Sequence, residues 1–137
     1  MSALPGAVAL LDRLNSLSIP WAIVTSGSVP VASARRAAGH LPVPEVFITC
    51  EQVKHGKPQP DAYLLGAERL GLAPADCIVV EDAPAGILSG LAAGCQVIAV
   101  NAPADTPKLD QVDLVLSSLE QINVEVTING ARVVRIG

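Results

Sequence analysis

The stretch CIVVEDAPAGILSGLAAGCQVIAV, residues 77–100, contains a complete strand–helix–strand pattern. Residues 77–80 form a short apolar run, residues 84–93 have apolar side chains at helical spacing and end before Gly94, and residues 97–100 form a second apolar run. Strands that are apolar on both faces are typical of parallel sheets that are covered on both sides. This stretch therefore predicts two parallel strands joined by a helix.

The same alternation continues along most of the chain. Further helices are predicted over residues 7–17, 28–38 and 61–70, with a short helix at 117–121. Further strands are predicted over residues 21–25, 46–49 and 113–116. Together these elements predict an α/β fold, a doubly wound (Rossmann-like) parallel sheet with helices on both faces.

The C-terminal tail has a different pattern. Residues 124–136 alternate with a period of two around Asn129-Gly130, which is the strongest short signal for a β-hairpin. We therefore divide the chain into a core domain over residues 1–121 and a C-terminal β-hairpin over residues 122–137.

Composition excludes several classes of protein. The net charge of −4, with no basic cluster beyond Arg35-Arg36, argues against nucleic acid as a partner. No apolar run approaches the roughly 20 residues that cross a membrane. The three cysteines lack the spacing of a zinc site or a disulfide framework, and the N-terminus does not resemble a signal peptide, so we expect a cytoplasmic protein.

Polar residues follow the predicted strands where a ligand is expected. In an open parallel sheet, ligands bind outside the carboxyl ends of the strands. Thr25-Ser26-Gly27 follows one strand and precedes a helix, so its hydroxyls and backbone N–H groups, with the helix N-terminus, fit a phosphate. The alternative is that Ser26 or Ser28 only caps the helix.

Two adjacent carboxylates, Glu81 and Asp82, follow another strand. Two neighbouring carboxylates repel each other unless a cation lies beside them. Magnesium suits oxygen ligands, whereas a zinc site needs His or Cys, which this segment lacks. The pair therefore predicts a Mg²⁺ site, with an ordinary helix cap as the alternative.

A lysine lies between these two segments, in the loop that precedes the helix at 61–70. Two prolines, Pro58 and Pro60, restrict the backbone beside Lys57, which favours a fixed position for its ammonium group against an anion. The alternative is an ordinary surface charge. His55, in the same loop, is predicted to be exposed rather than catalytic.

Three segments resemble a known family. IVTSG (23–27), GKPQPD (56–61) and VVEDAPAG (79–86), in this order, resemble motifs two, three and four of the haloacid-dehalogenase-like (HAD) phosphatase superfamily. The resemblance covers residues 5–121 and is closest to the β-phosphoglucomutase-like branch, which includes bacterial sugar-phosphate phosphatases.

The resemblance implies a function and a role for each motif. The function is Mg²⁺-dependent hydrolysis of small phosphorylated metabolites, sugar phosphates first, through an aspartyl-phosphate intermediate. Thr25 and the Ser26 N–H hold the phosphoryl group within the Thr25–Gly27 loop, Lys57 neutralises charge, and Asp82 with Glu81 binds Mg²⁺. Such roles suit phosphoryl transfer, where positioning and charge neutralisation dominate.

The first motif of the family is not found. It is an Asp-x-Asp-Gly-Thr segment that supplies the nucleophile, and no DxD occurs among the 137 residues. In the family, its strand lies between those equivalent to 21–25 and 77–81. We therefore expect this chain alone to be inactive, and we expect an N-terminal segment, a second copy, or direct pairing of the two strands to fill the gap.

Two other functions remain open at this point. A receiver-like phospho-acceptor also carries acids, a Thr or Ser, and a Lys at strand ends, although it would place its acidic pair first and its Lys last. A non-catalytic interaction fragment would associate through the uncovered strands.

Overall fold

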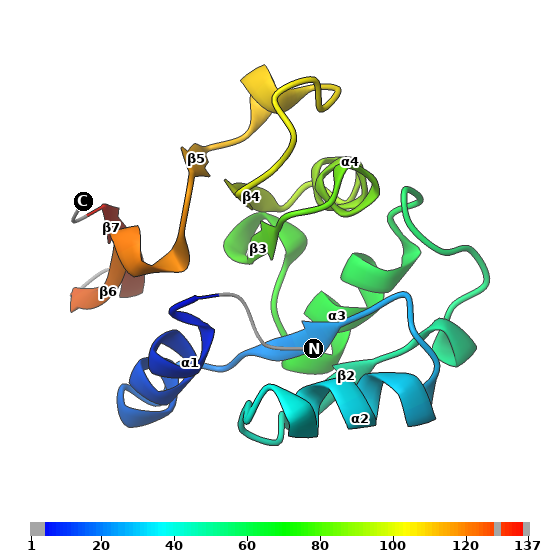
Figure 1. Cartoon of the computed structure of the whole chain (residues 1–137), viewed down its shortest axis with the longest axis horizontal. Coiled ribbons are helices and arrows are strands. Elements are labelled where there is room, and N and C mark those ends of the chain that lie inside the picture. Colours follow the sequence, from blue (N-terminus) through cyan, green and yellow to red (C-terminus); the bar gives the residue numbers. More distant parts are fainter. Residues whose placement is uncertain (1–4, 128–129, 136–137) are drawn as a thin grey trace.

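The computed structural model describes residues 5–127 and 130–135 of the chain (Figure 1). The helices are α1 (Ala7–Ser16), α2 (Val29–Ala38), α3 (Asp61–Leu70) and α4 (Pro84–Ala92). Short 3-10 helices are η1 (Cys50–Gln52), η2 (Pro74–Asp76), η3 (Leu109–Gln111) and η4 (Leu119–Gln121). The strands are β1 (Ala22–Val24), β2 (Val46–Ile48), β3 (Ile78–Glu81), β4 (Gln96–Val100), β5 (Leu114–Leu116), β6 (Ile122–Thr127) and β7 (Gly130–Arg135).

The strands form two parallel sheets and one antiparallel hairpin. β1 pairs with β2, and β3, β4 and β5 pair in that order, all in parallel. The predicted α/β fold with parallel strands is therefore confirmed. β6 pairs antiparallel with β7, as the alternation in the tail predicts; the predicted turn includes Asn129, which lies outside the described residues.

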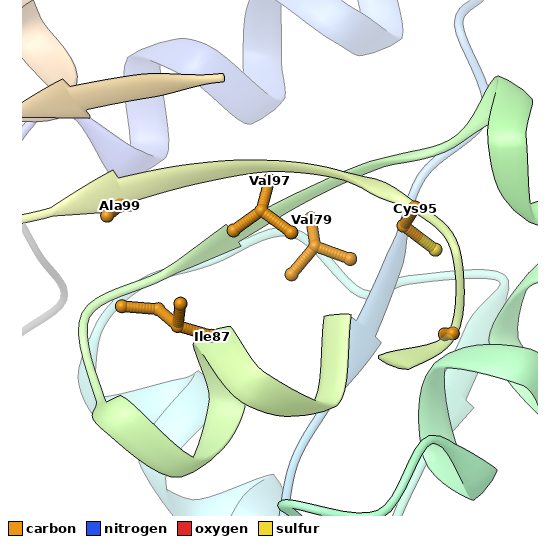
Figure 2. Close-up of a cluster of buried hydrophobic side chains, with 6 residues drawn as sticks. Val79, Ile87, Cys95, Val97 and Ala99 are labelled. Atoms are coloured by element: carbon orange, nitrogen blue, oxygen red, sulfur yellow. The ribbon is translucent and has the colours of Figure 1, made fainter. Parts of the chain in front are cut away.

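α4 covers one face of the sheet around β4. Val79 of β3 and Val97 of β4 are neighbours in register, and Ile87 of α4 packs with them in one buried cluster. Figure 2 shows these side chains between the strands and the helix. Gly90 allows the close approach, because a Cβ there would lie 3.0 Å from Val97 and 3.1 Å from Val79. The strand–helix–strand pattern of residues 77–100 is thus a packed unit.

α1 covers the opposite face of the same sheet. Ile98, Val100 and Leu116 form a second buried cluster, against which Ala7 and Leu10 of α1 pack. Helices therefore lie on both faces, as a doubly wound sheet requires. Ile122, the first residue of the predicted hairpin domain, also belongs to this cluster. The boundary at residue 121 stays a prediction.

α3 covers the β1–β2 sheet. Gly66 of α3 lies over the sheet, where an added Cβ would be 3.3 Å from Val24 and 4.0 Å from Ile48. In Figure 1, α2 lies on the other side of these strands. The Thr25–Ser28 loop that follows β1 leads directly into α2.

The two parallel sheets are not joined to each other. Among residues 5–127 and 130–135, β1 pairs only with β2 and β3 only with β4, so β1 and β3 do not pair directly with each other. Ile78 and Val80 of β3 are 41% and 38% exposed. α4 covers Val79 on one face of β3, whereas α1 packs beside β4 and β5, so Ile78 and Val80 on the other face of β3 are partly uncovered.

No helix in the described part of the chain combines the length and the apolar character that a membrane span needs.

Candidate active site

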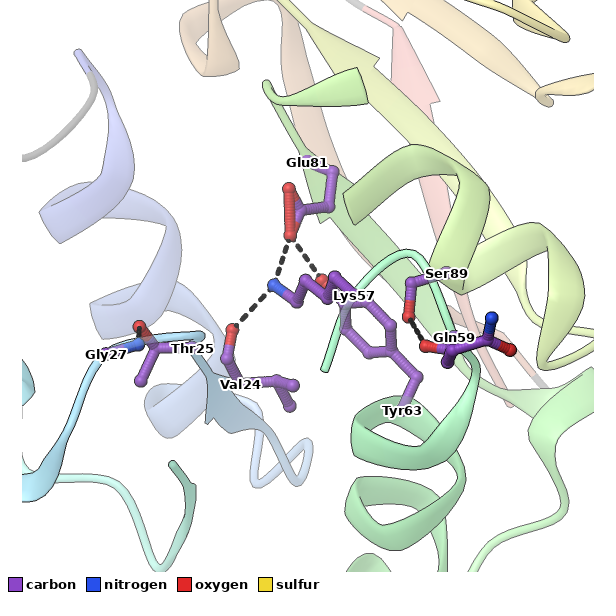
Figure 3. Close-up of polar contacts among 8 residues, drawn as sticks. All are labelled: Val24, Thr25, Gly27, Lys57, Gln59, Tyr63, Glu81 and Ser89. Atoms are coloured by element: carbon purple, nitrogen blue, oxygen red, sulfur yellow. Dashed lines mark hydrogen bonds and ion pairs between the residues drawn. The ribbon is translucent and has the colours of Figure 1, made fainter. Parts of the chain in front are cut away.

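Lys57 connects the carboxyl ends of the two separate sheets. Its Nζ donates a hydrogen bond to the Val24 carbonyl, at the end of β1, at 3.2 Å. The same Nζ lies 2.7 Å from Oε1 of Glu81, at the end of β3 (Figure 3). The side chains of Lys57 and Glu81 are each 10% exposed. The lysine is therefore a largely buried cation, and the alternative of an ordinary surface charge does not fit the structure.

Tyr63, near the start of α3, contacts both members of this ion pair. Its hydroxyl donates to Oε1 of Glu81 at 2.6 Å, and the Lys57 Nζ lies 4.9 Å from the centre of its ring. Burial, and then the negative charge of Glu81, raise the pKa of Tyr63 well above its usual value of 10.0. Tyr63 therefore stays a protonated donor to Glu81. Sequence reasoning missed this residue, because its helical spacing reads as core packing.

Gly86 makes room for the Glu81 carboxylate. Pro84 begins α4, and Gly86 faces back toward the end of β3. A Cβ at Gly86 would overlap the Glu81 carboxylate. The EDAPAG sequence therefore combines a carboxylate at a strand end with a helix whose first turn lacks a side chain at the point of contact.

The loop that carries Lys57 is fixed to α4 by a hydrogen bond from a buried serine. Ser89 is fully buried, and its hydroxyl donates to the Gln59 carbonyl at 2.6 Å (Figure 3). His55, in the same loop, is 58% exposed and lies 3.3 Å from Asp61. The prediction that His55 is exposed is confirmed.

The Thr25–Gly27 loop turns back on itself at the end of β1. The Gly27 N–H donates to Oγ1 of Thr25 at 3.1 Å, so the Thr25 hydroxyl hydrogen is left to donate elsewhere. Ser26 is exposed. Ser28 occupies the N-cap position of α2 without a side-chain capping bond, so the alternative that Ser28 serves as a side-chain cap is not supported.

A carboxylate that sequence reasoning missed lies at the N-terminus of α2. The Val29 N–H donates to Oε1 of Glu51 at 3.1 Å, and the Thr49 hydroxyl donates to Oε2 at 2.6 Å. The hydrogen bond from Thr49 is the largest cause that lowers the pKa of Glu51. Glu51 therefore occupies one N–H group at this helix N-terminus, and the predicted phosphate-binding role of the Thr25–Gly27 loop stays a prediction. The capping box formed by Thr49 and Gln52 is a signal for the short helix η1 that contains Glu51. It does not show that Glu51 contacts α2.

Asp82 is the acid that stays available in this part of the molecule. It is exposed, and it makes no hydrogen bond or ion pair with the residues that the structure describes. Within residues 5–127 and 130–135, no group of three His, Cys, Asp or Glu side chains converges on one point. A single carboxylate suits Mg²⁺, which is often held by one or two carboxylates together with waters and substrate phosphates. The predicted metal-binding roles of Asp82 and Glu81 stay predictions.

The fold and these motifs place the chain in a family. A family model for haloacid dehalogenase-like hydrolases matches residues 2–94. The chain therefore belongs to the haloacid dehalogenase-like hydrolases, in agreement with the resemblance of its three motifs.

Two relatives that match most of this chain are phosphatases by name. The chain is 72% identical over 130 residues to hexitol phosphatase A of Escherichia coli, covering 95% of this chain and 60% of that protein. It is 38% identical over 130 residues to glycerol-1-phosphate phosphohydrolase 1 of Saccharomyces cerevisiae, covering 88% and 52%. This chain thus spans little more than half the length of these relatives.

A solved structure has a similar fold. The HAD family hydrolase from Deinococcus radiodurans R1, determined with bound phosphate and sodium, superposes with a TM-score of 0.77 at 29% identity. The match covers 85% of this chain and 56% of that one.

Proposed function

We propose that this chain is the phosphate-binding part of a phosphatase that hydrolyses phosphate monoesters of small polyhydroxy compounds, with sugar and hexitol phosphates as the first candidates. The main support is the position of Lys57, a largely buried cation between the ends of β1 and β3. The 72% identity to a hexitol phosphatase supports this substrate class.

Lys57 and Thr25 supply the donors that a phosphoryl group needs. An ammonium group has three N–H donors, and two of those on Lys57 go to Val24 and Glu81. The third is left for an anion, and Thr25, which follows Val24 directly, has a hydroxyl hydrogen to donate. The exposed Ser26 and the backbone N–H groups of the loop complete the proposed phosphate site. Donors fixed in advance stabilise the charge of the transferring phosphoryl group.

We place a Mg²⁺ ion at Asp82, with Glu81 as a second candidate ligand. When bound, magnesium neutralises charge on the phosphoryl oxygens and orients the substrate. Oε1 of Glu81 already accepts hydrogen bonds from Lys57 and Tyr63, which leaves Asp82 as the less engaged carboxylate.

The nucleophile of the proposed reaction lies outside this chain. We expect an aspartate on an N-terminal segment, or a second copy of the chain, to complete the sheet between β1 and β3. In the described part of the chain, both strands have an unpaired edge, and Val80 of β3 is exposed. Since the hexitol phosphatase match covers 60% of that protein, the other 40% is where such a segment is sought.

The proposed setting is the cytoplasm, with a small phosphorylated metabolite as the ligand and neither nucleic acid nor membrane as a partner. Three free cysteines suit a reducing compartment.

Complementation tests the function. The chain is purified alone and together with a separate polypeptide that corresponds to the uncovered 40% of hexitol phosphatase A. Phosphate release from a hexitol phosphate and from glycerol 1-phosphate is measured with Mg²⁺ and with a chelator. We expect no release by either polypeptide alone, and Mg²⁺-dependent release by the mixture that K57M abolishes. A folded mixed complex that releases no phosphate contradicts the proposal.

Two further measurements separate the alternatives. A stable acyl phosphate on Asp82 after treatment with acetyl phosphate would favour a receiver-like phospho-acceptor. Dimerisation that does not depend on Mg²⁺, without any phosphate binding, would favour a non-catalytic interaction fragment.

A further inference from the structure

Tyr63 forms a polar contact with Glu81 to which the proposed reaction assigns no role. Its hydroxyl and the Lys57 ammonium both donate to one atom, Oε1 of Glu81, at 2.6 and 2.7 Å. These distances are typical of hydrogen bonds to a charged acceptor, which are stronger than neutral ones. The carboxylate oxygen is therefore fixed by two donors that come from different segments of the chain.

The tyrosine ring has a second contact with the same pair. The Lys57 Nζ lies 4.9 Å from the ring centre, within the range at which a ring face attracts a cation. The ring also packs against the buried cluster that contains Val79 and Ile87. The ring position is thus set by the core, and the hydroxyl transfers that position to Glu81.

Glu81 cannot move away from Tyr63 toward α4. The carboxylate lies against Gly86, where no side chain intervenes, and α4 occupies the space behind it. Lys57, by contrast, has a flexible side chain, and its other bond goes to the Val24 carbonyl on a different sheet. The position of its ammonium group therefore depends on where Glu81 is held.

We infer that Tyr63 is a positioning residue, whose hydroxyl fixes Glu81 so that the Lys57 ammonium keeps its third N–H directed at a phosphoryl group. This inference rests on the proposed function for its purpose, although the positioning itself is independent of activity. Tyr63 contacts no substrate in this assignment and acts only through Glu81 and Lys57.

The composition of the chain makes the inference measurable. Lys54, Lys57 and Lys108 are its only lysines, and Tyr63 is its only tyrosine. Lys54 and Lys108 are exposed, so they serve as internal references for a lysine ammonium in water. Nuclear magnetic resonance of ¹⁵N-labelled protein then reports the rate at which each ammonium group exchanges hydrogen with water.

The test compares Y63F with V97A. Y63F keeps the ring and removes only the hydroxyl. V97A removes methyl groups from the same buried cluster without touching Glu81 or Lys57, so it controls for a general loss of packing. In the parent chain we expect slow hydrogen exchange only for the Lys57 ammonium group. In Y63F we expect this exchange to be at least about fivefold faster, because the net free energy of one hydrogen bond corresponds to about that factor in an equilibrium constant. V97A is expected to leave the Lys57 rate unchanged.

Unchanged Lys57 exchange in Y63F overturns the inference, and so does equal acceleration by V97A. Titration with inorganic phosphate separates this result from the proposed function. If phosphate shifts the Lys57 signal in the parent chain, Y63F is expected to weaken phosphate binding and K57M to abolish it. If phosphate does not bind the parent chain, the phosphate site fails, whereas the exchange rates still decide the role of Tyr63.

Discussion

The Ser89 hydroxyl donates to the Gln59 carbonyl at 2.6 Å, and this bond joins α4 to the loop that carries Lys57. Ser89 is fully buried. S89A removes the donor and leaves a carbonyl without that partner, so we expect a loss of about 1–3 kcal/mol in the free energy of unfolding. Urea unfolding measures the loss.

Ser16 provides the matched control for S89A. Its hydroxyl also donates to a backbone carbonyl, that of Arg13 at 2.9 Å, but in an exposed place. S16A is expected to change the free energy of unfolding by less than about 0.5 kcal/mol. Equal losses in both variants would contradict the importance of the bond from the buried Ser89 hydroxyl.

Gly86 is the position where an added methyl group meets a charged side chain. Alanine normally favours a helix over glycine by about 1 kcal/mol. In G86A the new Cβ overlaps the Glu81 carboxylate, so we expect a net loss of about 1–3 kcal/mol despite that gain. Thermal unfolding and the Lys57 ammonium signal report the change.

Gly56 is the control for G86A, because a Cβ there would meet nothing within 4 Å. G56A is expected to be neutral, or slightly stabilising through the unfolded chain. A G86A protein with undiminished stability and an unchanged Lys57 signal would show that Glu81 has room to move.

The pattern of apolar runs was enough to predict the parallel α/β fold. It also predicted that Thr25 and Glu81 follow the carboxyl ends of their strands, where ligands bind in an open parallel sheet. The exposure of Ile78 and Val80 could not be predicted. A continuous apolar run shows that a strand is apolar on both faces, but it does not show whether another element covers each face.

The residues that contact Glu81 and Glu51 also could not be predicted from the sequence. Glu81 is bonded to Tyr63 and Lys57, 18 and 24 residues away, and Glu51 caps a helix 22 residues before it. Such contacts depend on how α3 and α2 pack on the strands, which local patterns do not specify. The carboxylate pair therefore indicated a cation, whereas the cation seen beside Glu81 is a lysine.

Tyr63 gives a spectroscopic prediction. Burial and the Glu81 charge raise the pKa of Tyr63 far above 10.0, and it is the only tyrosine. Stability from the protonated hydroxyl is thus fully present below about pH 10 and lost as pH rises further. Absorbance of tyrosinate is expected to appear only when the chain unfolds. A reversible titration near pH 10 in the folded protein would contradict the buried contact.

Lys57 and Glu81 are expected to be energetically coupled. K57M leaves the Glu81 carboxylate, 10% exposed, without its counter-ion, and a loss of about 3–5 kcal/mol is expected. E81Q likewise leaves the ammonium unpaired. In the double variant neither charge remains, so its loss is expected to fall short of the sum of the single losses by about 1–3 kcal/mol. Additive losses in urea unfolding would show that the two charges do not interact.

Glu51 predicts a dependence of stability on acid. Hydrogen bonds from Thr49 and then from backbone N–H groups lower the pKa of Glu51 below its usual 4.5 in the folded chain. A lowered folded pKa means that the contribution is present above about pH 4.5 and is lost as pH falls through the folded value. Thermal midpoints of the parent chain and E51Q are therefore expected to differ at neutral pH and to converge in acid. E68Q removes an exposed carboxylate of α3 that has no side-chain hydrogen bond among the described residues, and its difference from the parent is expected to stay small throughout. A gap between the parent and E51Q that widens as pH falls would mean that Glu51 is not held as a carboxylate at the N-terminus of α2.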